Sequence, residues 1–395
     1  MLAYSLANFG GNMVNAFSNT ALPLYLGAYQ LPNWLIGLLA QERSLVGGFI
    51  QPVVGALSDR TRTPLGRRRP FFLVGVPLTT ASLIILALHP PVWAVLAVMP
   101  FFAFFLAIAN DPYLALMADI TPVEQRGTMG GWMALLNMLG QVTLLLLAAA
   151  LWQSHRGWVF AALVAGLVVS FGLTFLLVKE PPAHAWQVPP RPIRYRPVAY
   201  VRNLLAHREL SKYVGSQLFF WLGNGAAVPF LTRFAVEVLG VAEGEAFLLV
   251  FVAVASTASL ALPAGWLGSH FGKQRVLSVG LFAFVPVALV GSQVQTVAQT
   301  YVVMACLGAC NAAVTALLFP LLADLMPTDR RGELTGVGSL VWSVAQPVGS
   351  FTAGVFIDAT GTYRAVFVVA GLLFALSFVL LRTIKADSRH DAAGT

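Results

Sequence analysis

The sequence predicts an all-α membrane protein built from two related halves of six transmembrane helices each. Three observations lead to this prediction. The 395 residues are 58% hydrophobic and only 10% charged, whereas soluble domains are about 25% charged. The apolar residues form runs of roughly 20, which is enough to cross a bilayer as a helix. Several motifs also recur at an offset of about 205 positions.

Twelve apolar runs define the predicted spans, at 4–29, 34–57, 71–89, 92–118, 128–152, 157–178, 211–238, 245–268, 275–292, 297–323, 333–357 and 364–382. They give an N-terminal half at 1–178, a linker at 179–210, a C-terminal half at 211–382 and a tail at 383–395. Prolines in the linker stretch PPAHAWQVPPRPIRYRP oppose a regular helix. The first span is too long for the apolar region of a cleavable signal and lacks a basic flank, so no such signal is expected.

The net charge of +8 is explained by topology. Of the 24 Lys and Arg residues, 20 fall in alternate connectors that would share one side, while the opposite side holds Arg156 and Arg364. Basic connectors stay cytoplasmic, so both termini are predicted to be cytoplasmic in a cytoplasmic (inner) membrane. This distribution argues against nucleic-acid binding. Cys306 and Cys310 have no metal-site spacing, and no metal site, cofactor or catalytic set is expected.

The internal repeat is clearest after the fourth and tenth spans. ADITPVEQRG at 118–127 returns as ADLMPTDRRG at 323–332, which matches Asp119 with Asp324 and Arg126 with Arg331. The connector GALSDRTRTPLGRRR returns, shortened, as GWLGSHFGKQR. Two further pairs at the same offset lie within spans, namely Gln141 with Gln346 and Asn19 with Asn224. The two halves are therefore predicted to share one architecture.

The connector after the second span carries candidate gating residues. Asp59 lies at the membrane edge, where an anion can pair with arginines or favour a helix N-terminus. Gly66 permits a tight turn. Contacts of this kind can hold the inner gate of a two-state transporter, although the arginines alone could simply signal topology. The predicted gating set is Asp59, Arg60, Gly66, Arg67, Arg68, Arg69, Asp119, Arg126, Asp324, Arg330 and Arg331.

This connector also carries a family resemblance. QPVVGALSDR followed by GRRRPF resembles the signature of the sucrose–proton symporters, near the glycoside–pentoside–hexuronide cation symporters of the major facilitator superfamily. PYLALMADI, at the end of the fourth span, is also similar to that family. The resemblance covers roughly residues 1–130 and implies sugar uptake coupled to a proton. The chain departs from the pattern at Ala103 and Leu114, where those symporters carry an acid and an arginine, and at Glu42 and Arg43, where they are uncharged.

Charged residues inside a span are costly and usually functional. Glu42 is the first candidate for proton coupling, because burial favours the protonated carboxyl, and Asp111 is the second. Arg43 could bind an anionic substrate group or pair with an acid other than its neighbour. A static ion pair is the alternative for Glu42, and backbone contacts at a kink before Pro112 are the alternative for Asp111. Arg233 and Glu237 have the spacing of a helix-end pair.

Amides and aromatic rings concentrate in the spans expected to line a central cavity. Amides supply donors and acceptors for a sugar, and aromatic rings supply a flat apolar face; hydrogen bonding between helices is the alternative role. Asparagines 8, 12, 15 and 19 fall on one face of the first span. The predicted substrate-binding set is Asn8, Asn12, Asn15, Asn19, Arg43, Asn137, Gln141, Gln217, Trp221, Asn224, Asn311, Trp342 and Gln346.

The predicted function is secondary active transport, specifically sugar–proton symport by alternating access. The expected partners are a small polar solute, a proton or sodium ion, and the lipid bilayer, and a monomer is expected. Three other functions stay open: proton-driven efflux, uptake of an anionic or amine-bearing solute, and a non-transporting role as a sensor or assembly factor.

Overall fold

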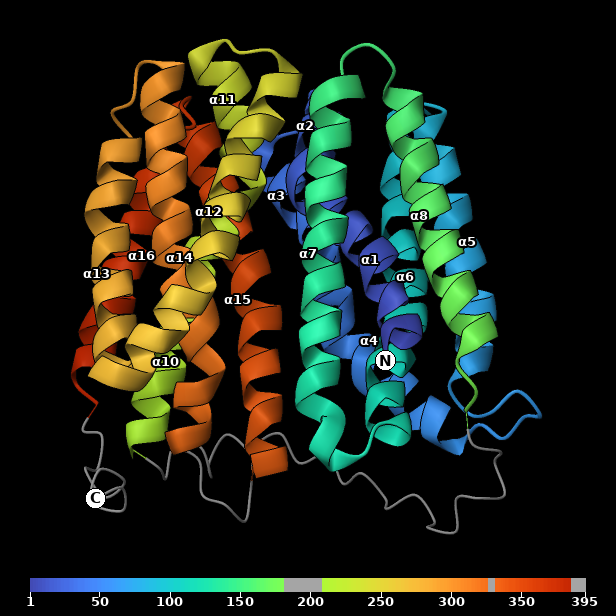
Figure 1. Ribbon diagram of the computed structural model, residues 1–395. Helices are drawn as coiled ribbons and strands as arrows, with labels where there is room; N and C mark the ends of the chain where they lie inside the picture. Colours follow the sequence, from blue (N-terminus) through green and yellow to red (C-terminus); the bar gives the residue numbers. More distant parts are fainter. Residues whose placement is uncertain (181–207, 326–330, 385–395) are drawn as a thin grey trace, which may run out of the picture. The chain divides into compact units, whose positions relative to one another are not determined.

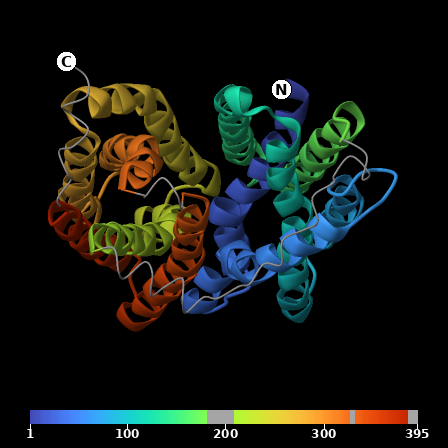
Figure 2. The ribbon, with the colours of Figure 1, turned by 90° about the horizontal axis from the view of Figure 1, so that it is seen from below.

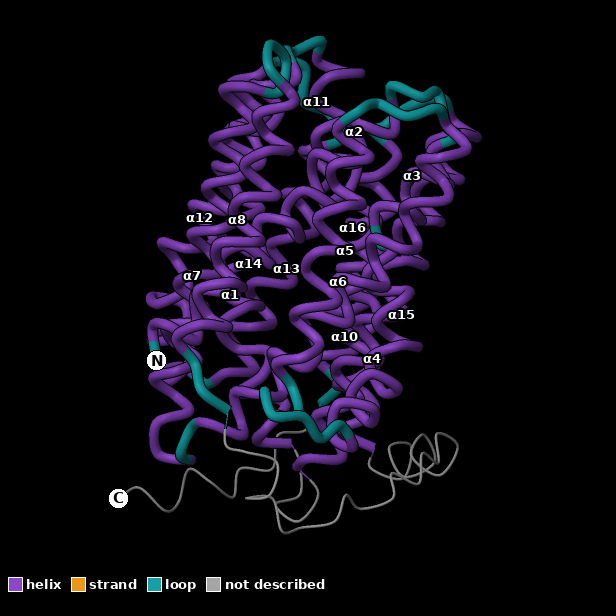
Figure 3. Tube along the Cα trace, turned by 90° about the vertical axis from the view of Figure 1, so that its right-hand side faces the viewer, coloured by secondary structure: helices purple, strands orange, loops and turns teal. Residues whose placement is uncertain are grey.

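The computed structural model describes residues 1–180, 208–325 and 331–384. These residues form helices and short connections, without any β-strand among them (Figures 1 and 3). The side chains of residues 48, 49, 52, 118, 123, 323 and 331–340 lie outside the described part. Most of the predicted linker, most of the tail, Arg330 and the side chain of Arg331 therefore lie outside it as well.

The chain divides into two compact units, which are described one at a time. The helices of unit 1 are α1 (Leu2–Ala16), the π-turn η1 (Phe17–Ala21), α2 (Leu22–Gly27), α3 (Asn33–Ala40), α4 (Glu42–Arg60), α5 (Arg69–Ala87), α6 (Val92–Ile120), η2 (Val123–Gln125), α7 (Arg126–Leu151) and α8 (Arg156–Leu177). Unit 1 also includes residues 231–236 of α11 (Leu231–Leu239) and α12 (Glu243–Phe271) up to residue 251.

The helices of unit 2 are α10 (Arg208–Ala227), η4 (Val228–Phe230), the rest of α12, α13 (Lys273–Gly291), α14 (Val297–Leu325), α15 (Arg331–Thr360) and α16 (Ala365–Arg382). Across the described residues, eight helices are long and apolar enough to cross a membrane, by length and composition alone. The helices follow the order of the predicted spans. The residue boundaries predicted for the two halves stay a prediction.

Three predicted spans are divided, which the apolar pattern did not indicate. The run 4–29 is interrupted by η1, just before Pro23 at the start of α2. Because proline has no N–H to donate, it breaks the regular hydrogen-bond ladder one turn earlier. The run 211–238 is interrupted at η4, which contains Pro229. The run 34–57 breaks at Gln41, whose backbone leaves the helical region with φ −108° and ψ 17°.

In unit 1, α1 packs between α7 and α8 (Figure 1). Glycines permit this close approach. A Cβ atom added to Gly10 of α1 would lie 2.2 Å from the Ser170 hydroxyl of α8, and one added to Gly140 of α7 would lie 2.2 Å from the Phe9 carbonyl oxygen. Small residues at helix contacts are typical of membrane proteins, since packing replaces the hydrophobic effect there. α5 packs on α6 and α8, and α4 packs on α6.

Unit 2 repeats this packing. α10 packs on α15 and α16, as α1 packs on α7 and α8. α13 packs on α14 and α16, as α5 packs on α6 and α8, and Figure 2 shows the orange α14 beside α13. Phe220, Phe284 and Phe374 form its aromatic core, with ring centroids of Phe284 and Phe374 4.6 Å apart. The repeat in the sequence is therefore also a repeat of helix packing.

Candidate functional site

Three of the four predicted asparagines of α1 form a hydrogen-bonded chain. The Asn12 amide donates to the backbone carbonyl of Asn137 on α7 at 2.6 Å. The Asn15 amide donates to the Asn12 side chain at 3.1 Å, and the Asn19 amide donates to the Asn15 carbonyl at 2.9 Å. The Gln41 amide then donates to the Asn19 side-chain oxygen at 3.0 Å. The chain of amides thus runs from α7 along α1 to the break between α3 and α4.

Asn19 lies in the π-turn η1 rather than in a regular helix. The wider turn shifts its side chain away from the 100° spacing on which the asparagine face was predicted. Asn8 does not join the chain, and its amide nitrogen is buried with no hydrogen-bond partner among the described residues. Gln141 lies one turn after Asn137 on α7, and Asn137 contributes its carbonyl to the chain.

Glu42 begins α4, directly after Gln41. Its side chain is 4% exposed, and neither carboxylate oxygen has a hydrogen-bond partner among the described residues. A buried carboxylate without a partner is expensive to keep ionised, so such a group tends to bind a proton or a cation. No ion pair to Glu42, the alternative role expected for it, is formed within the described ranges 1–180, 208–325 and 331–384.

Arg43 faces a different acid. Asp111 of α6 interacts with Arg43 electrostatically, across the packed helices α4 and α6. Within the described part of the chain, the two groups form no ion pair shorter than 4.0 Å. The Asp111 Oδ2 atom is buried and has no hydrogen-bond partner there either. The structure therefore places Arg43 with Asp111 and leaves Glu42 apart from both.

The predicted gating residues of unit 1 form a charge cluster where α4, α5, α6 and α8 have their ends. We define the α4–α5 charge cluster as Asp59, Arg67, Arg68, Asp119 and Glu180. Arg67 pairs with Asp119 at 2.6 Å, and Arg68 pairs with Asp59 at 2.6 Å and with Asp119 at 3.1 Å. Two largely buried arginines are thus balanced by carboxylates from α4 and α6, of which Asp119 is buried more deeply than Asp59.

Glu180 caps the N-terminus of α5. Its carboxylate accepts hydrogen bonds from the backbone N–H groups of Arg68, at 2.9 Å, and Arg69, at 3.3 Å. An anion at a helix N-terminus is favoured by the helix dipole and satisfies unpaired N–H groups. Gly66 precedes this cap with φ +105°, and a Cβ atom there would lie 2.3 Å from a Glu180 carboxylate oxygen. Only glycine fits both the turn and the carboxylate.

The remaining predicted gating residues of unit 1 behave differently. The Arg69 guanidinium donates to the Phe175 carbonyl and lies 4.2 Å above the Phe175 ring. Arg126 donates to the Thr121 carbonyl at 3.3 Å. Arg60 is exposed. Arg69 and Arg126 therefore bind backbone carbonyls of neighbouring segments.

Unit 2 carries a reduced version of the charge cluster. Lys273, the counterpart of Arg67, pairs with Asp324 at 2.6 Å. Gly272, the counterpart of Gly66, also has a positive φ, of +92°. Gln274 replaces Arg68 and donates to the carbonyls of Leu381 and Ile384. The Lys273–Asp324 pair is far more exposed than the Arg67–Asp119 pair, because 36% of the Lys273 side chain and 46% of the Asp324 side chain are accessible to solvent.

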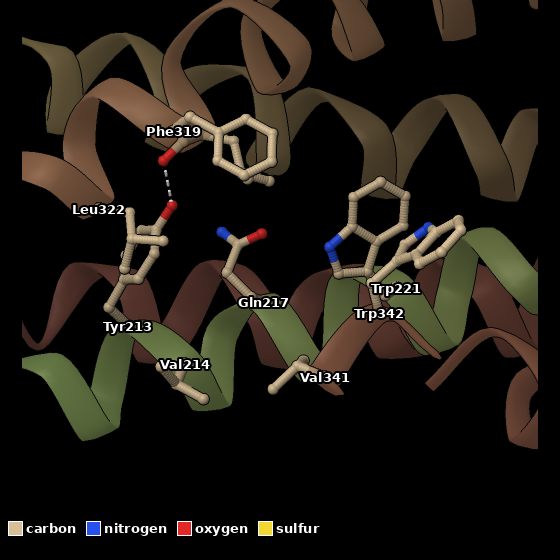
Figure 4. Close-up of a pocket in the computed structure, with 9 residues that line it drawn as sticks. Tyr213, Val214, Gln217, Trp221, Phe319, Leu322, Val341 and Trp342 are labelled. Atoms are coloured by element: carbon tan, nitrogen blue, oxygen red, sulfur yellow. Dashed lines mark hydrogen bonds between the residues drawn. The ribbon is translucent and has the colours of Figure 1, made fainter. Parts of the chain in front are cut away.

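The predicted polar residues of unit 2 form two contacts and one pocket. Gln346 of α15 donates to the Asn224 side chain of α10 at 3.1 Å, and Asn311 donates to the Thr257 hydroxyl at 3.5 Å. Gln217, Trp221 and Trp342 line a common pocket of about 220 Å³ between α10, α14 and α15 (Figure 4). The Trp221 and Trp342 rings meet edge to face with centroids 6.4 Å apart.

At the end of unit 1 opposite the charge cluster, residues of α11 and α12 are bound tightly. Arg233 is 9% exposed and donates to the Asn33 side chain at 3.0 Å. The Thr232 hydroxyl donates to the carbonyl of Thr20 in η1 at 2.9 Å. Arg156 pairs with Glu243 at 3.0 Å. These contacts fix α11 and the start of α12 within unit 1.

A family model described as MFS/sugar transport protein matches residues 3–386. The chain belongs to the major facilitator superfamily. This facilitator is 26% identical over 378 residues to the multidrug resistance protein MdtG of Salmonella arizonae, covering 89% of this chain and 87% of that protein.

Solved facilitators share the fold at low sequence identity. A mutant of the nucleoside transporter NupG superposes with a TM-score of 0.78 at 12% identity, covering 97% of this chain and 99% of that one. A D-xylose–proton symporter superposes with a TM-score of 0.71 at 15% identity, covering 97% and 96%. The predicted all-helical facilitator fold is confirmed, and the protein is a multi-pass membrane transporter rather than an enzyme.

Two residues of this facilitator site were not predicted from the sequence. Gln41 directly precedes the charged pair Glu42 and Arg43, and an amide in an apolar run was the available signal for it. Glu180 stands directly after Lys179, where the chain leaves α8, more than 100 positions from the arginines that it contacts. An acid beside the basic connectors was the available signal, but its partner could not be assigned from spacing.

The two repeated aspartates should differ in their contribution to stability. Asp119 is 11% exposed and pairs with two arginines, whereas Asp324 is 46% exposed and pairs with one lysine. Removing one partner of a buried pair costs about 3 kcal/mol or more, while an exposed pair contributes about 0–1 kcal/mol. Thermal unfolding in detergent should show a much lower midpoint for Asp119→Asn than for Asp324→Asn. Equal losses would contradict the importance of the buried cluster.

The two repeated glycines form a second matched pair. Gly66→Ala and Gly272→Ala both place alanine at positive φ, which costs about 1 kcal/mol or more. Only the Cβ atom at position 66 meets Glu180, because no heavy atom lies within 4 Å of the position at 272. We expect Gly66→Ala to lower the unfolding midpoint further than Gly272→Ala. Indistinguishable midpoints would show that the Glu180 cap does not require the glycine.

Proposed function

We propose that this facilitator is a proton-coupled sugar symporter that works by alternating access. It would lie in the cytoplasmic (inner) membrane with both termini cytoplasmic. The observation that carries the proposal is the buried Glu42 carboxylate, whose two oxygens have no partner among the described residues. The family model, described as MFS/sugar transport protein, supports the sugar.

Glu42 has the properties required of a coupling group. An unpaired carboxylate inside a membrane protein is costly when charged, and protonation removes that cost. A conformational change that exposes Glu42 to one side and then to the other would let it bind a proton and release it. Asp111 is the second proposed coupling residue. Asp111 has Arg43 as a charged neighbour, whereas neither carboxylate oxygen of Glu42 has a partner among the described residues, so Glu42 is the stronger candidate.

The sugar would be bound by the amides of α1. Each amide offers both donors and an acceptor, which suits the hydroxyl groups of a sugar. Gln41 links this chain to Glu42, because it donates to Asn19 and precedes Glu42 directly. Sugar bound by Asn15 and Asn19 could displace these internal hydrogen bonds and change the surroundings of Glu42. Substrate binding and protonation would thereby influence each other.

The α4–α5 charge cluster would act at the cytoplasmic gate. It fastens the ends of α4, α5 and α6 to Glu180, which follows α8. These helix ends would move together during the transition. The arginines of this connector fit a cytoplasmic location, because basic connectors are retained on that side.

Efflux is the second candidate function. It is supported by the 26% identity to the multidrug resistance protein MdtG and by the apolar pocket of unit 2. In that case the amide chain of α1 would be a packing feature. The two functions differ in the direction in which solute and proton move.

Solute-driven proton movement tests the proposal. The protein would be reconstituted in liposomes with a pH-sensitive dye inside, and glucose, xylose, sucrose, maltose, melibiose and raffinose would be added outside. Symport predicts acidification of the interior with at least one sugar, because each sugar molecule carries a proton with it. No proton signal with any of these sugars, together with proton-driven loss of a preloaded dye, would overturn symport in favour of efflux.

Glu42→Gln tests the coupling role in the same liposomes. Glutamine is neutral and close in size, so exchange of labelled sugar across the membrane should continue. Accumulation driven by a proton gradient should fall to simple equilibration. Glu124→Gln is the control, because Glu124 is exposed in η2, and it should accumulate sugar normally. Unchanged accumulation by Glu42→Gln would exclude Glu42 as the coupling residue.

A further inference from the structure

The pocket of unit 2 has walls that suit a flat apolar group. Trp221 and Trp342 form one side with rings at 82° to each other, and Phe319 lies across from them (Figure 4). Tyr213 also lines it, but its hydroxyl already donates to the Leu318 carbonyl. Apart from Gln217, the remaining lining residues are valines and leucines. Aromatic side chains of this kind favour stacked or edge-on contacts with another ring.

One polar group in this pocket is unsatisfied. Gln217 is 5% exposed, and its side-chain oxygen is buried without a hydrogen-bond partner among the described residues. Figure 4 shows its amide pointing into the space beside Trp221 and Trp342. Buried polar groups are nearly always hydrogen-bonded. A ligand that fills the pocket would therefore be expected to donate a hydrogen bond to this oxygen.

The size and polarity of the pocket restrict the class of ligand that it can bind. A dry apolar cavity of about 150 Å³ holds benzene, so about 220 Å³ accommodates one six-membered ring with small substituents. A free sugar does not suit this pocket, because its hydroxyl groups would outnumber the available polar partners and remain unpaired. An alkyl chain does not suit it either, because Gln217 would stay unpaired.

We propose that this pocket binds an aromatic ring that carries a hydroxyl or amino hydrogen-bond donor. The ligand is thus a phenol or an arylamine, and its binding does not depend on the proposed sugar transport. The residues that recognise the ring are Gln217, Trp221, Phe319 and Trp342.

Resorcinol is a suitable probe because it carries an aromatic ring with hydroxyl donors and no sugar. It would be titrated by calorimetry into the full-length protein in lipid nanodiscs. Two analogues remove one feature each: 1,3-dimethoxybenzene cannot donate, and cyclohexane-1,3-diol has no aromatic ring. We expect saturable binding of resorcinol, and binding about fivefold weaker for the dimethoxy analogue, as the loss of one neutral hydrogen bond predicts. Equal binding of all three, or no saturable binding of resorcinol, would overturn the proposal.

A substitution of Gln217 tests whether resorcinol binds in this pocket. Gln217→Leu should weaken resorcinol binding about fivefold by the same loss, and should leave binding of 1,3-dimethoxybenzene unchanged. Gln295→Leu is the matched control, because Gln295 is exposed in the connection before α14, and it should bind resorcinol normally. If Gln217→Leu does not fold, the comparison of resorcinol with its two analogues on the native protein still tests whether the ligand must be an aromatic ring with a hydrogen-bond donor. Unchanged resorcinol binding by a folded Gln217→Leu protein would overturn the assignment.

The outcome is separable from that of the proposed function. Binding of resorcinol without any sugar-driven proton signal would uphold the subsite and overturn sugar symport. Sugar-driven proton uptake without resorcinol binding would uphold symport and overturn the subsite.

Discussion

Polar groups inside a membrane-spanning bundle must find their partners within the protein, because lipid offers none. This constraint explains most of the polar contacts in this facilitator. Asn12, Asn15 and Asn19 satisfy one another along α1, and Gln41 completes the chain. Glu42 stands beside that chain, and its carboxylate has no hydrogen-bond partner within the part of the protein that the structure describes. The exception matters because a group that the fold leaves unsatisfied is available to a proton or a ligand.

Charge is used in two contrasting ways in unit 1. Near the ends of α4, α5 and α6, Arg68 binds Asp59 and Asp119, and its backbone N–H binds Glu180. Removing a member of such a network leaves a buried charge with fewer partners, which is costly. Glu42 lies within a span, where its ionised form has no such support. The α4–α5 charge cluster suits a fixed structural contact between helix ends. The environment of Glu42 suits a group that changes its protonation state.

The sequence was informative where the signal was local or periodic. Apolar runs indicated the spans, the offset of 205 positions indicated the repeat, and the arginine-rich connector indicated a partner for Asp59. Features that depend on long-range contacts could not be read in this way. The Glu180 cap joins segments more than 100 positions apart. The open side-chain oxygen of Gln217 depends on how three helices pack, which spacing within α10 does not reveal.

Infrared difference spectroscopy tests most directly whether Glu42 takes up the coupling proton. Spectra of the protein in nanodiscs would be compared at acidic and alkaline pH, following the carbonyl stretching band of protonated carboxylic acids. If Glu42 is the coupling group, a band should disappear as pH rises, be absent in Glu42→Gln and be retained in Asp111→Asn. A band that persists unchanged in Glu42→Gln would contradict it.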